Sequence, residues 1–127
     1  MKTLVLDLDE TLVHSAFKQP KNYHIQLPVK MDSREFIVYV LIRPGCREFL
    51  EEMAKIYEVV VYTASLSQYA DPLMDIIDPQ RLCTARLFRE HCTLMDGVYV
   101  KDLSKLGRSL GNLILIDNSR NSYKLQP

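Results

Sequence analysis

Three short apolar runs dominate the hydrophobic pattern of the chain, and each ends at a polar residue. The runs are residues 4–6, 59–62 and 113–116. They are followed directly by Asp7, Thr63 and Asp117. Apolar runs without alternation are typical of strands that are buried on both faces of a parallel sheet, and such sheets bind ligands just beyond the carboxyl ends of their strands. The pattern therefore predicts that Asp7, Thr63 and Asp117 converge.

Between the first two runs the pattern changes to alternation. Apolar and polar residues alternate over 23–29 and again over 36–42, with the polar pair Asp32-Ser33 between them. This predicts an antiparallel hairpin inserted after the first strand. Helical spacing of apolar residues then predicts a helix over 46–57, just after Pro44. The expected fold class is α/β, a doubly wound, mostly parallel sheet with a small antiparallel hairpin insert.

The second half of the chain carries further local signals. Ser67 is expected to cap a short helix, which Pro72 either kinks or restarts behind Asp71 as a new cap. The pair Asp96-Gly97 lies between two short apolar stretches and predicts a tight hairpin. Lys101 follows the second stretch, as the other candidate site residues follow their strands.

Composition narrows the class of protein. A chain of 127 residues with 47% hydrophobic content predicts one ordered domain, 1–127. Sixteen basic and sixteen acidic residues cancel, which argues against direct binding to nucleic acid or to an anionic membrane. The apolar stretches are shorter than the roughly 18 residues of a membrane span. Three cysteines without CxxC spacing, and no signal peptide, predict a reduced intracellular setting.

The most specific motif is Asp7-x-Asp9-x-Thr11. At a strand end, Asp7 and Asp9 can point to the same side, so that one carboxylate attacks phosphorus while the other handles the proton of the leaving group. Their proximity separates their pKa values, so that one stays ionised and the other is protonated. Phosphoryl transfer also requires positive charge around the phosphate oxygens, which Lys101 and a hard divalent cation would supply.

These motifs resemble the haloacid dehalogenase superfamily, and more narrowly the small carboxy-terminal-domain phosphatases of the Fcp1/Scp type, or NLI-interacting-factor-like domains. The matching stretches are LVLDLDETLVHS, VYVLIRPG, EVVVYTASLSQYADP, RLFREHC, YVKDLSKLGR and LILIDNS. The resemblance implies a Mg²⁺-dependent protein serine/threonine phosphatase that acts through an aspartyl phosphate on phosphoserine peptides. It also implies that the enzyme acts in the nucleus, on the repeats of RNA polymerase II.

The resemblance further implies a role for each site residue. Asp7 would be the nucleophile, Asp9 the general acid and later the base for water, and Thr63 and Lys101 would hold the phosphate. The other implied roles are Asp7, the Asp9 carbonyl and Asn118 as Mg²⁺ ligands, Asp117 orienting Lys101 or a metal-bound water, and Thr11 hydrogen-bonding the loop.

An apolar slot for a proline beside the phosphoserine is also implied. Its positions would be Phe17, Val29, Met31, Val38 and Leu66, with Tyr69 and Arg89 along the peptide groove. From the residues alone two alternatives stay open. Apolar residues on a hairpin serve equally well in core packing, and Arg89 could simply pair with Glu90.

Two features of length bear on the activity. About 50 residues separate Thr11 from Thr63, and about 40 separate Thr63 from Lys101. Strands and helices of ordinary length fill both intervals, so we expect no cap domain and a site open to a phosphopeptide.

Relatives continue past the DNS motif, whereas this chain stops at Pro127. We therefore expect a domain that lacks the C-terminal strand and helix of the family and exposes the strand before Asp117 as an edge. We also expect the domain to be a monomer.

Two other functions compete with the enzyme. A catalytically impaired phosphopeptide-binding module would fit a shortened chain. A receiver-type phosphoacceptor domain also gathers Asp, Thr and Lys at strand ends, but its acceptor Asp follows a middle strand, where this chain has Thr63. The phosphatase is the better match.

Overall fold

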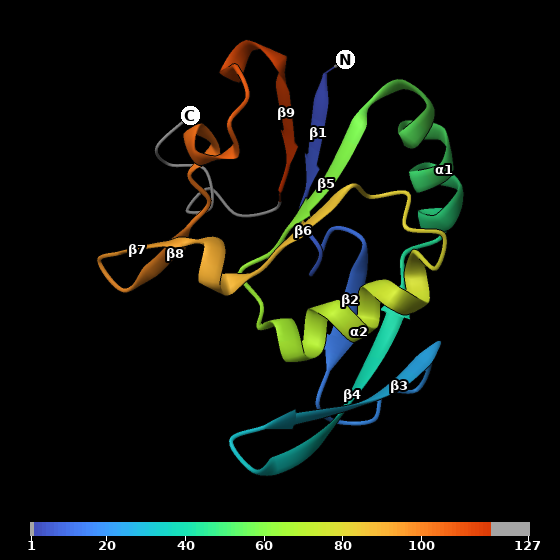
Figure 1. Ribbon diagram of the computed structural model, residues 1–127. Coiled ribbons are helices and arrows are strands. Elements are labelled where there is room, and N and C mark those ends of the chain that lie inside the picture. The colour runs from blue at the N-terminus through green and yellow to red at the C-terminus, as the bar shows by residue number, and fades with distance from the viewer. Residues whose placement is uncertain (1, 118–127) are drawn as a thin grey trace.

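A parallel sheet forms the central layer of the computed structural model, which describes residues 2–117 (Figure 1). Within these residues its strand order is β6-β5-β1-β9. The strands are β1 (Thr3–Leu6), β5 (Glu58–Tyr62), β6 (Ala85–Leu87) and β9 (Leu113–Ile116). Leu6 lies beside Val61 and Ile116 in the register, so the next residues, Asp7 and Asp117, leave neighbouring strands side by side. The predicted α/β class is confirmed.

Both faces of this sheet are buried, which explains why its strands show no alternation. Leu4 and Leu6 point to one face, where they join α1 (Cys46–Ile56) and α2 (Ser67–Ile77) in the main core. Val5 points to the other face and packs with residues of β5 and of the 3-10 turn η2 (Leu103–Leu106). The remaining 3-10 turns are η1 (Arg89–His91) and η3 (Leu110–Asn112).

The predicted hairpin insert is confirmed and gains a third strand. β3 (Ile25–Met31) and β4 (Arg34–Ile42) pair antiparallel, and β2 (Val13–Ala16) adds to the other edge of β4. Asp32 and Ser33 form the turn with φ of 50° and 66°, the left-handed pair that tight hairpins need. The apolar face of this sheet packs against α2, which lies between the two sheets (Figure 1).

In the second half, the hairpin prediction is confirmed and the capping prediction is wrong. β7 (Thr93–Met95) and β8 (Val98–Val100) flank Asp96 and Gly97, whose φ values are 51° and 77°. α2 begins at Ser67 itself and continues through Pro72 without restarting at Asp71. Its buried face, which includes Leu73 and Met74, packs into the core and keeps the helix continuous where proline removes one hydrogen bond.

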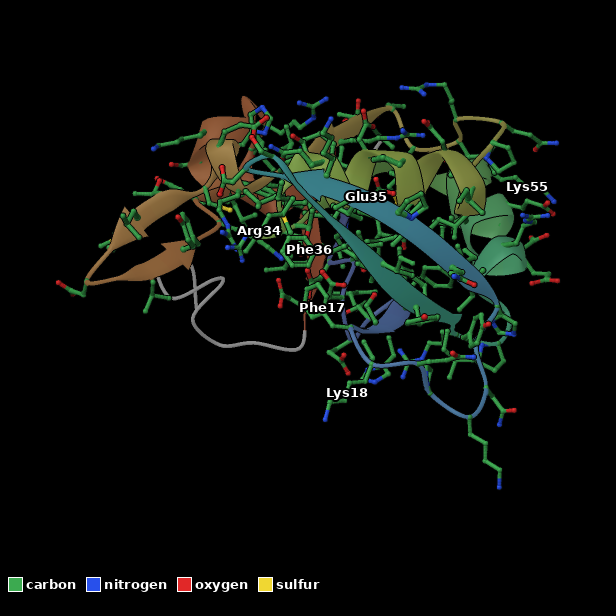
Figure 2. All side chains as sticks on the ribbon, turned by 90° about the horizontal axis from the view of Figure 1, so that it is seen from below. Phe17, Lys18, Arg34, Glu35, Phe36 and Lys55 are labelled. Atoms are coloured by element: carbon green, nitrogen blue, oxygen red, sulfur yellow. The ribbon has the colours of Figure 1, made fainter. Side chains whose placement is uncertain are left out.

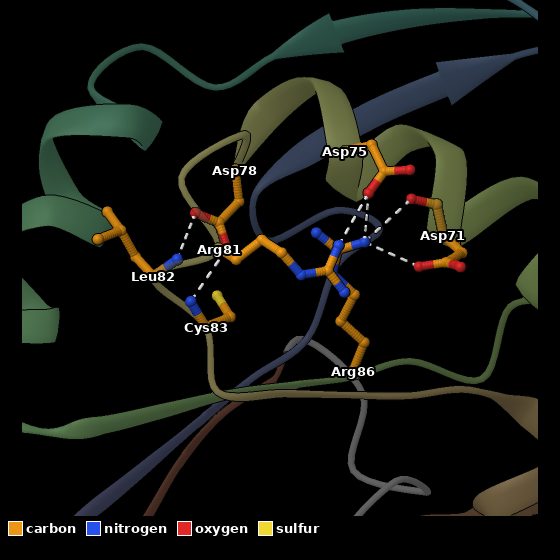
Figure 3. A network of polar contacts seen from close by, with 7 residues as sticks. All are labelled: Asp71, Asp75, Asp78, Arg81, Leu82, Cys83 and Arg86. Carbon is orange, nitrogen blue, oxygen red and sulfur yellow. Dashed lines mark hydrogen bonds and ion pairs between the residues drawn. The ribbon is translucent and has the colours of Figure 1, made fainter.

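A polar network fixes α2 to β6 and to the loop between them (Figure 3). Arg86 Nη1 on β6 lies 2.8 Å from Asp71 Oδ1 and 2.7 Å from Asp75 Oδ1 on the helix. In the loop, the buried carboxylate of Asp78 accepts the backbone N–H groups of Leu82 and Cys83. The network matters for the site because α2 and the segment after β6 both contribute residues to it.

Across residues 2–117, the helices are too short or too polar to cross a bilayer.

Candidate active site

A buried ammonium group lies between two carboxylates at the carboxyl ends of β1 and β9. Lys101 Nζ is 2.9 Å from Asp7 Oδ1 and also donates to Asp117 Oδ2. Lys101 is 1% exposed, and the side chain of Asp117 is fully buried. Lys101 is the residue directly after β8, and its side chain extends from there to the two carboxylates. The structure therefore brings together Asp7, Lys101 and Asp117 as the pattern predicted.

The charge of Lys101 opposes the effect of burial on the pKa of Asp7. Burial raises the pKa of Asp7 above its ordinary value, and the neighbouring carboxylate of Asp117 raises it further. The ammonium of Lys101 and its hydrogen bond act against this rise. Lys101 therefore favours the ionised carboxylate, which is the form able to act as a nucleophile.

Thr63 follows β5, the strand next to β1, and is 1% exposed. Its backbone N–H donates to the Leu87 carbonyl over 2.9 Å. Its Oγ1 accepts the backbone N–H of Ser65 over 3.1 Å. These bonds fix Thr63 at the same end of the sheet as Asp7, where it was predicted.

The loop after Asp7 is tied into a tight turn. The Leu8 carbonyl accepts the backbone N–H groups of Thr11, Leu12 and Val13 over 2.9 to 3.3 Å. The Thr11 carbonyl in turn accepts Arg43 Nη1 over 3.0 Å. The backbone of Thr11 thus takes part in the turn that contains Asp9, and the supporting role of Thr11 stays a prediction.

Two hydroxyl groups hold the carboxylate of Asp9. Ser65 Oγ donates to Asp9 Oδ2 over 2.5 Å, and the Tyr69 hydroxyl donates to Asp9 Oδ1 over 2.7 Å. Ser15 Oγ bonds the Tyr69 oxygen. Burial and the nearby Asp9 charge raise the pKa of Tyr69, which keeps its donor proton in place. The resemblance predicted Tyr69 only as a residue of the peptide groove, whereas its bond to Asp9 and the contributions of Ser15 and Ser65 were missed.

A pocket of about 340 Å³ opens beside Asp9. Its lining includes the predicted substrate positions, which are Phe17, Val29, Met31, Val38, Leu66, Tyr69 and Arg89. Val29 and Val38 are also buried in the core, so the packing interpretation holds for them as well. Phe17 is 69% exposed and meets the Phe36 ring edge-on at 6.1 Å. The two rings lie together at one end of the antiparallel sheet (Figure 2).

Arg89 lines this pocket, and two contacts hold its side chain. Its Nε donates to the Ala64 carbonyl over 2.8 Å. Its guanidinium lies 4.7 Å from the centre of the Tyr99 ring on β8, a cation-π contact. Arg89 is therefore fixed by Ala64 and Tyr99 and takes no part in the ion pairs found among residues 2–117, which leaves the alternative pairing with Glu90 without support.

The donors near Asp7 suit a hard cation. Asp7 and Asp117 offer carboxylate oxygens, and both contact Lys101. Oxygen-only donors are the ligands that Mg²⁺ prefers. Within residues 2–117 these groups do not form a cluster of three acidic, His or Cys ligands, and the predicted ligand Asn118 lies outside the described residues. The donor chemistry fits Mg²⁺.

Comparison with known proteins bears on the whole chain. Residues 2–127 match the model of a family described as NLI interacting factor-like phosphatase, which confirms the resemblance drawn from the motifs. The chain is 51% identical over 126 residues to Phosphatase PSR1 of Saccharomyces cerevisiae and to the human CTD small phosphatase-like protein. It is 50% identical over 124 residues to the human carboxy-terminal domain RNA polymerase II polypeptide A small phosphatase 1.

These matches cover 98% to 99% of the chain but only 30% to 48% of the relatives. A solved structure of the fission yeast RNA polymerase II CTD phosphatase Fcp1, bound to beryllium fluoride, superimposes with a TM-score of 0.82 at 22% identity. The superposition covers 98% of this chain and 39% of the Fcp1 chain, and it supports the α/β fold described above.

Proposed function

Because the chain belongs to the family of NLI interacting factor-like phosphatases, we propose that it is a protein serine/threonine phosphatase that acts through an aspartyl phosphate. The observation that supports this most is the buried Lys101 bonded to Asp7, with Asp9 two residues further on. The open pocket next to Asp9 supports a phosphate presented on a peptide.

In the first step an oxygen of Asp7 attacks phosphorus, and the bond between phosphorus and the serine oxygen breaks. Asp9 gives its proton to that oxygen, so the serine leaves as a neutral hydroxyl. In the second step Asp9 takes a proton from water, and the water oxygen attacks the phosphorus. The bond between phosphorus and the Asp7 oxygen breaks, which releases phosphate and restores the carboxylate.

Lys101 and Thr63 hold the phosphate oxygens in this proposal. Charge neutralisation and positioning supply most of the catalysis in phosphoryl transfer. Mg²⁺, held by Asp7, the Asp9 carbonyl and Asn118, would add positive charge at the phosphate.

The substrate is proposed to be a phosphoserine peptide with a nearby proline. Phe17 and its neighbours offer an apolar slot, and a proline reaches it with little conformational entropy left to lose. The names of relatives support the C-terminal repeats of RNA polymerase II as the protein substrate, and a nuclear setting with them. A monomer without direct nucleic acid or membrane contacts remains our prediction.

Asp7→Asn tests the function directly. The variant keeps the shape of the side chain and relieves repulsion from Asp117, so it should fold and yet release no phosphate from a phosphoserine peptide in the presence of Mg²⁺. Circular dichroism checks the fold, and phosphate release checks the activity. Substantial turnover by the folded variant would contradict Asp7 as the nucleophile.

The same assay tests the binding-module alternative, for which the wild-type chain would bind the phosphopeptide without turnover. A receiver-type domain is disfavoured because β5, an inner strand of the sheet, is followed by Thr63 and offers no acceptor carboxylate there.

A further inference from the structure

Three segments that are distant in the sequence contribute hydroxyl groups around the side chain of Asp9. Ser65 lies in the loop between β5 and α2, Tyr69 on the first turn of α2, and Ser15 on β2. Each Asp9 oxygen accepts one hydroxyl, Oδ2 from Ser65 and Oδ1 from Tyr69. Since Tyr69 gives its only proton to Asp9, its contact with Ser15 must be donated by Ser15. Ser65, Tyr69 and Ser15 are called the hydroxyl clamp below.

Ser65 also connects the parts of the site to one another. Its N–H donates to Thr63 Oγ1 over 3.1 Å, and its carbonyl accepts the N–H of Arg89 over 3.0 Å. One residue thus touches the proposed phosphate-binding threonine, the proposed acid and the peptide pocket. A side chain bonded at both oxygens has a fixed direction, whereas an unbonded carboxylate rotates.

We propose that Ser65 and Tyr69 are positioning residues that aim Asp9 at the leaving oxygen, with Ser15 completing the clamp. This rests on the proposed function, because it assigns the clamp to the proton transfer of the first step. All the clamp residues line the pocket beside Asp9, so the acid is held where a phosphoserine would enter.

A positioning role and structural support differ in how the loss of activity depends on the basicity of the leaving group. Serine leaves poorly without a proton, phenol less poorly, and p-nitrophenol leaves well as an anion. Ser65→Ala should therefore lower kcat/KM about tenfold on a phosphoserine peptide, about fivefold on phenyl phosphate and about twofold on p-nitrophenyl phosphate. Tyr69→Phe should give the same order. The two aryl phosphates are too small to fill the pocket, so their difference does not depend on peptide binding.

Ser67→Ala is the matched control. Ser67 also lies at the start of α2, but its hydroxyl contacts Gln68 at 3.4 Å and not Asp9, so all the rates should match wild type. Ser65→Thr retains a hydroxyl and should recover the rate on phenyl phosphate. Equal losses on both aryl phosphates, or no loss on the peptide, would overturn the clamp while leaving the proposed function intact. A wild-type chain inactive on every ester would overturn the proposed function, and the clamp with it.

Discussion

The buried lysine at residue 101 sets the charge of the proposed catalytic centre. Its ammonium is the cation that both Asp7 and Asp117 contact, and water is nearly excluded from the cluster. A buried charge whose partner is removed is strongly destabilising, because neither water nor another group replaces the lost interaction.

Lys101→Met should therefore destabilise the fold as well as abolish activity. Two buried carboxylates would then face each other, and we expect the free energy of unfolding to fall by about 3–5 kcal/mol. Adding Asp117→Asn removes one of the charges and should recover part of the loss. Urea unfolding followed by circular dichroism measures both. A Lys101→Met protein as stable as wild type would show that water or another cation screens the carboxylates.

At Phe17 the expected effect is on substrate choice. Its ring is 69% exposed and packs edge-on against Phe36, so truncation should leave the stability almost unchanged. Phe17→Ala removes contact area for a docked proline, and kcat/KM on a proline-containing phosphopeptide should fall roughly tenfold, or about 1.4 kcal/mol. Activity on p-nitrophenyl phosphate should stay as it is. Equal losses on both substrates would mean that Phe17 only supports the fold.

Site residues that follow an apolar run were predicted from the sequence. Site residues whose role depends only on contacts in the folded structure were not. Asp7, Asp117 and Lys101 each follow an apolar run, and the parallel register then places them together. Ser65 carries no such signal, because a lone serine after a strand fits any loop. Its partner Asp9 lies 56 residues away, so the bond appears only once the strands are arranged.

At the scale of elements, turn chemistry was the reliable guide. Asp32-Ser33 and Asp96-Gly97 were recognised because few residues adopt positive φ readily, and both stretches form hairpin turns. β2 was missed because it has only four residues, two of them polar, and depends on pairing with β4. The start of α2 was placed wrongly because Ser67 looks like a cap in sequence, whereas burial of the helix face determines where the helix begins.

The contact between α2 and β6 depends on a buried arginine. The side chain of Arg86 is 6% exposed, while Asp71 and Asp75 are more than half exposed. Removing both carboxylates, in Asp71→Asn/Asp75→Asn, would leave the guanidinium buried without an opposite charge beside it. Arg86→Met removes the charge and keeps an apolar stem of similar length. The melting temperature should therefore fall further in the double variant than in Arg86→Met.

The exposed pair of Lys55 and Glu52 provides the control for this comparison. Both side chains are about two-thirds exposed, so Glu52→Gln should leave the melting temperature unchanged. If Arg86→Met proved more damaging than the double variant, the hydrogen bonds of Arg86 rather than its charge would hold α2 in place.

At the scale of the whole molecule, the parallel sheet brings residues from separate sequence motifs together in one site. The carboxyl ends of β1, β5 and β9 meet at one edge, which is why residues from both ends of the sequence share it. The antiparallel sheet adds the pocket wall and packs through α2, so the proposed peptide and phosphate sites share one core. The alternating pattern predicted the hairpin of β3 and β4, but the position of this sheet over α2 follows from packing that no local pattern encodes.

We expect the stability of the whole domain to depend on Mg²⁺, which the carboxylate of Asp7 is proposed to bind. A ligand that binds only the folded state stabilises it by mass action, and Mg²⁺ at about a hundredfold excess over its Kd would add about 2.7 kcal/mol. For a domain of this size the melting temperature should then rise by roughly 8 °C, and chelation should reverse the rise. Asp7→Asn removes a proposed ligand and should give a smaller response to Mg²⁺ in the same thermal scan. If that variant responded as wild type does, Mg²⁺ would bind elsewhere, and its proposed place at the phosphate would be wrong.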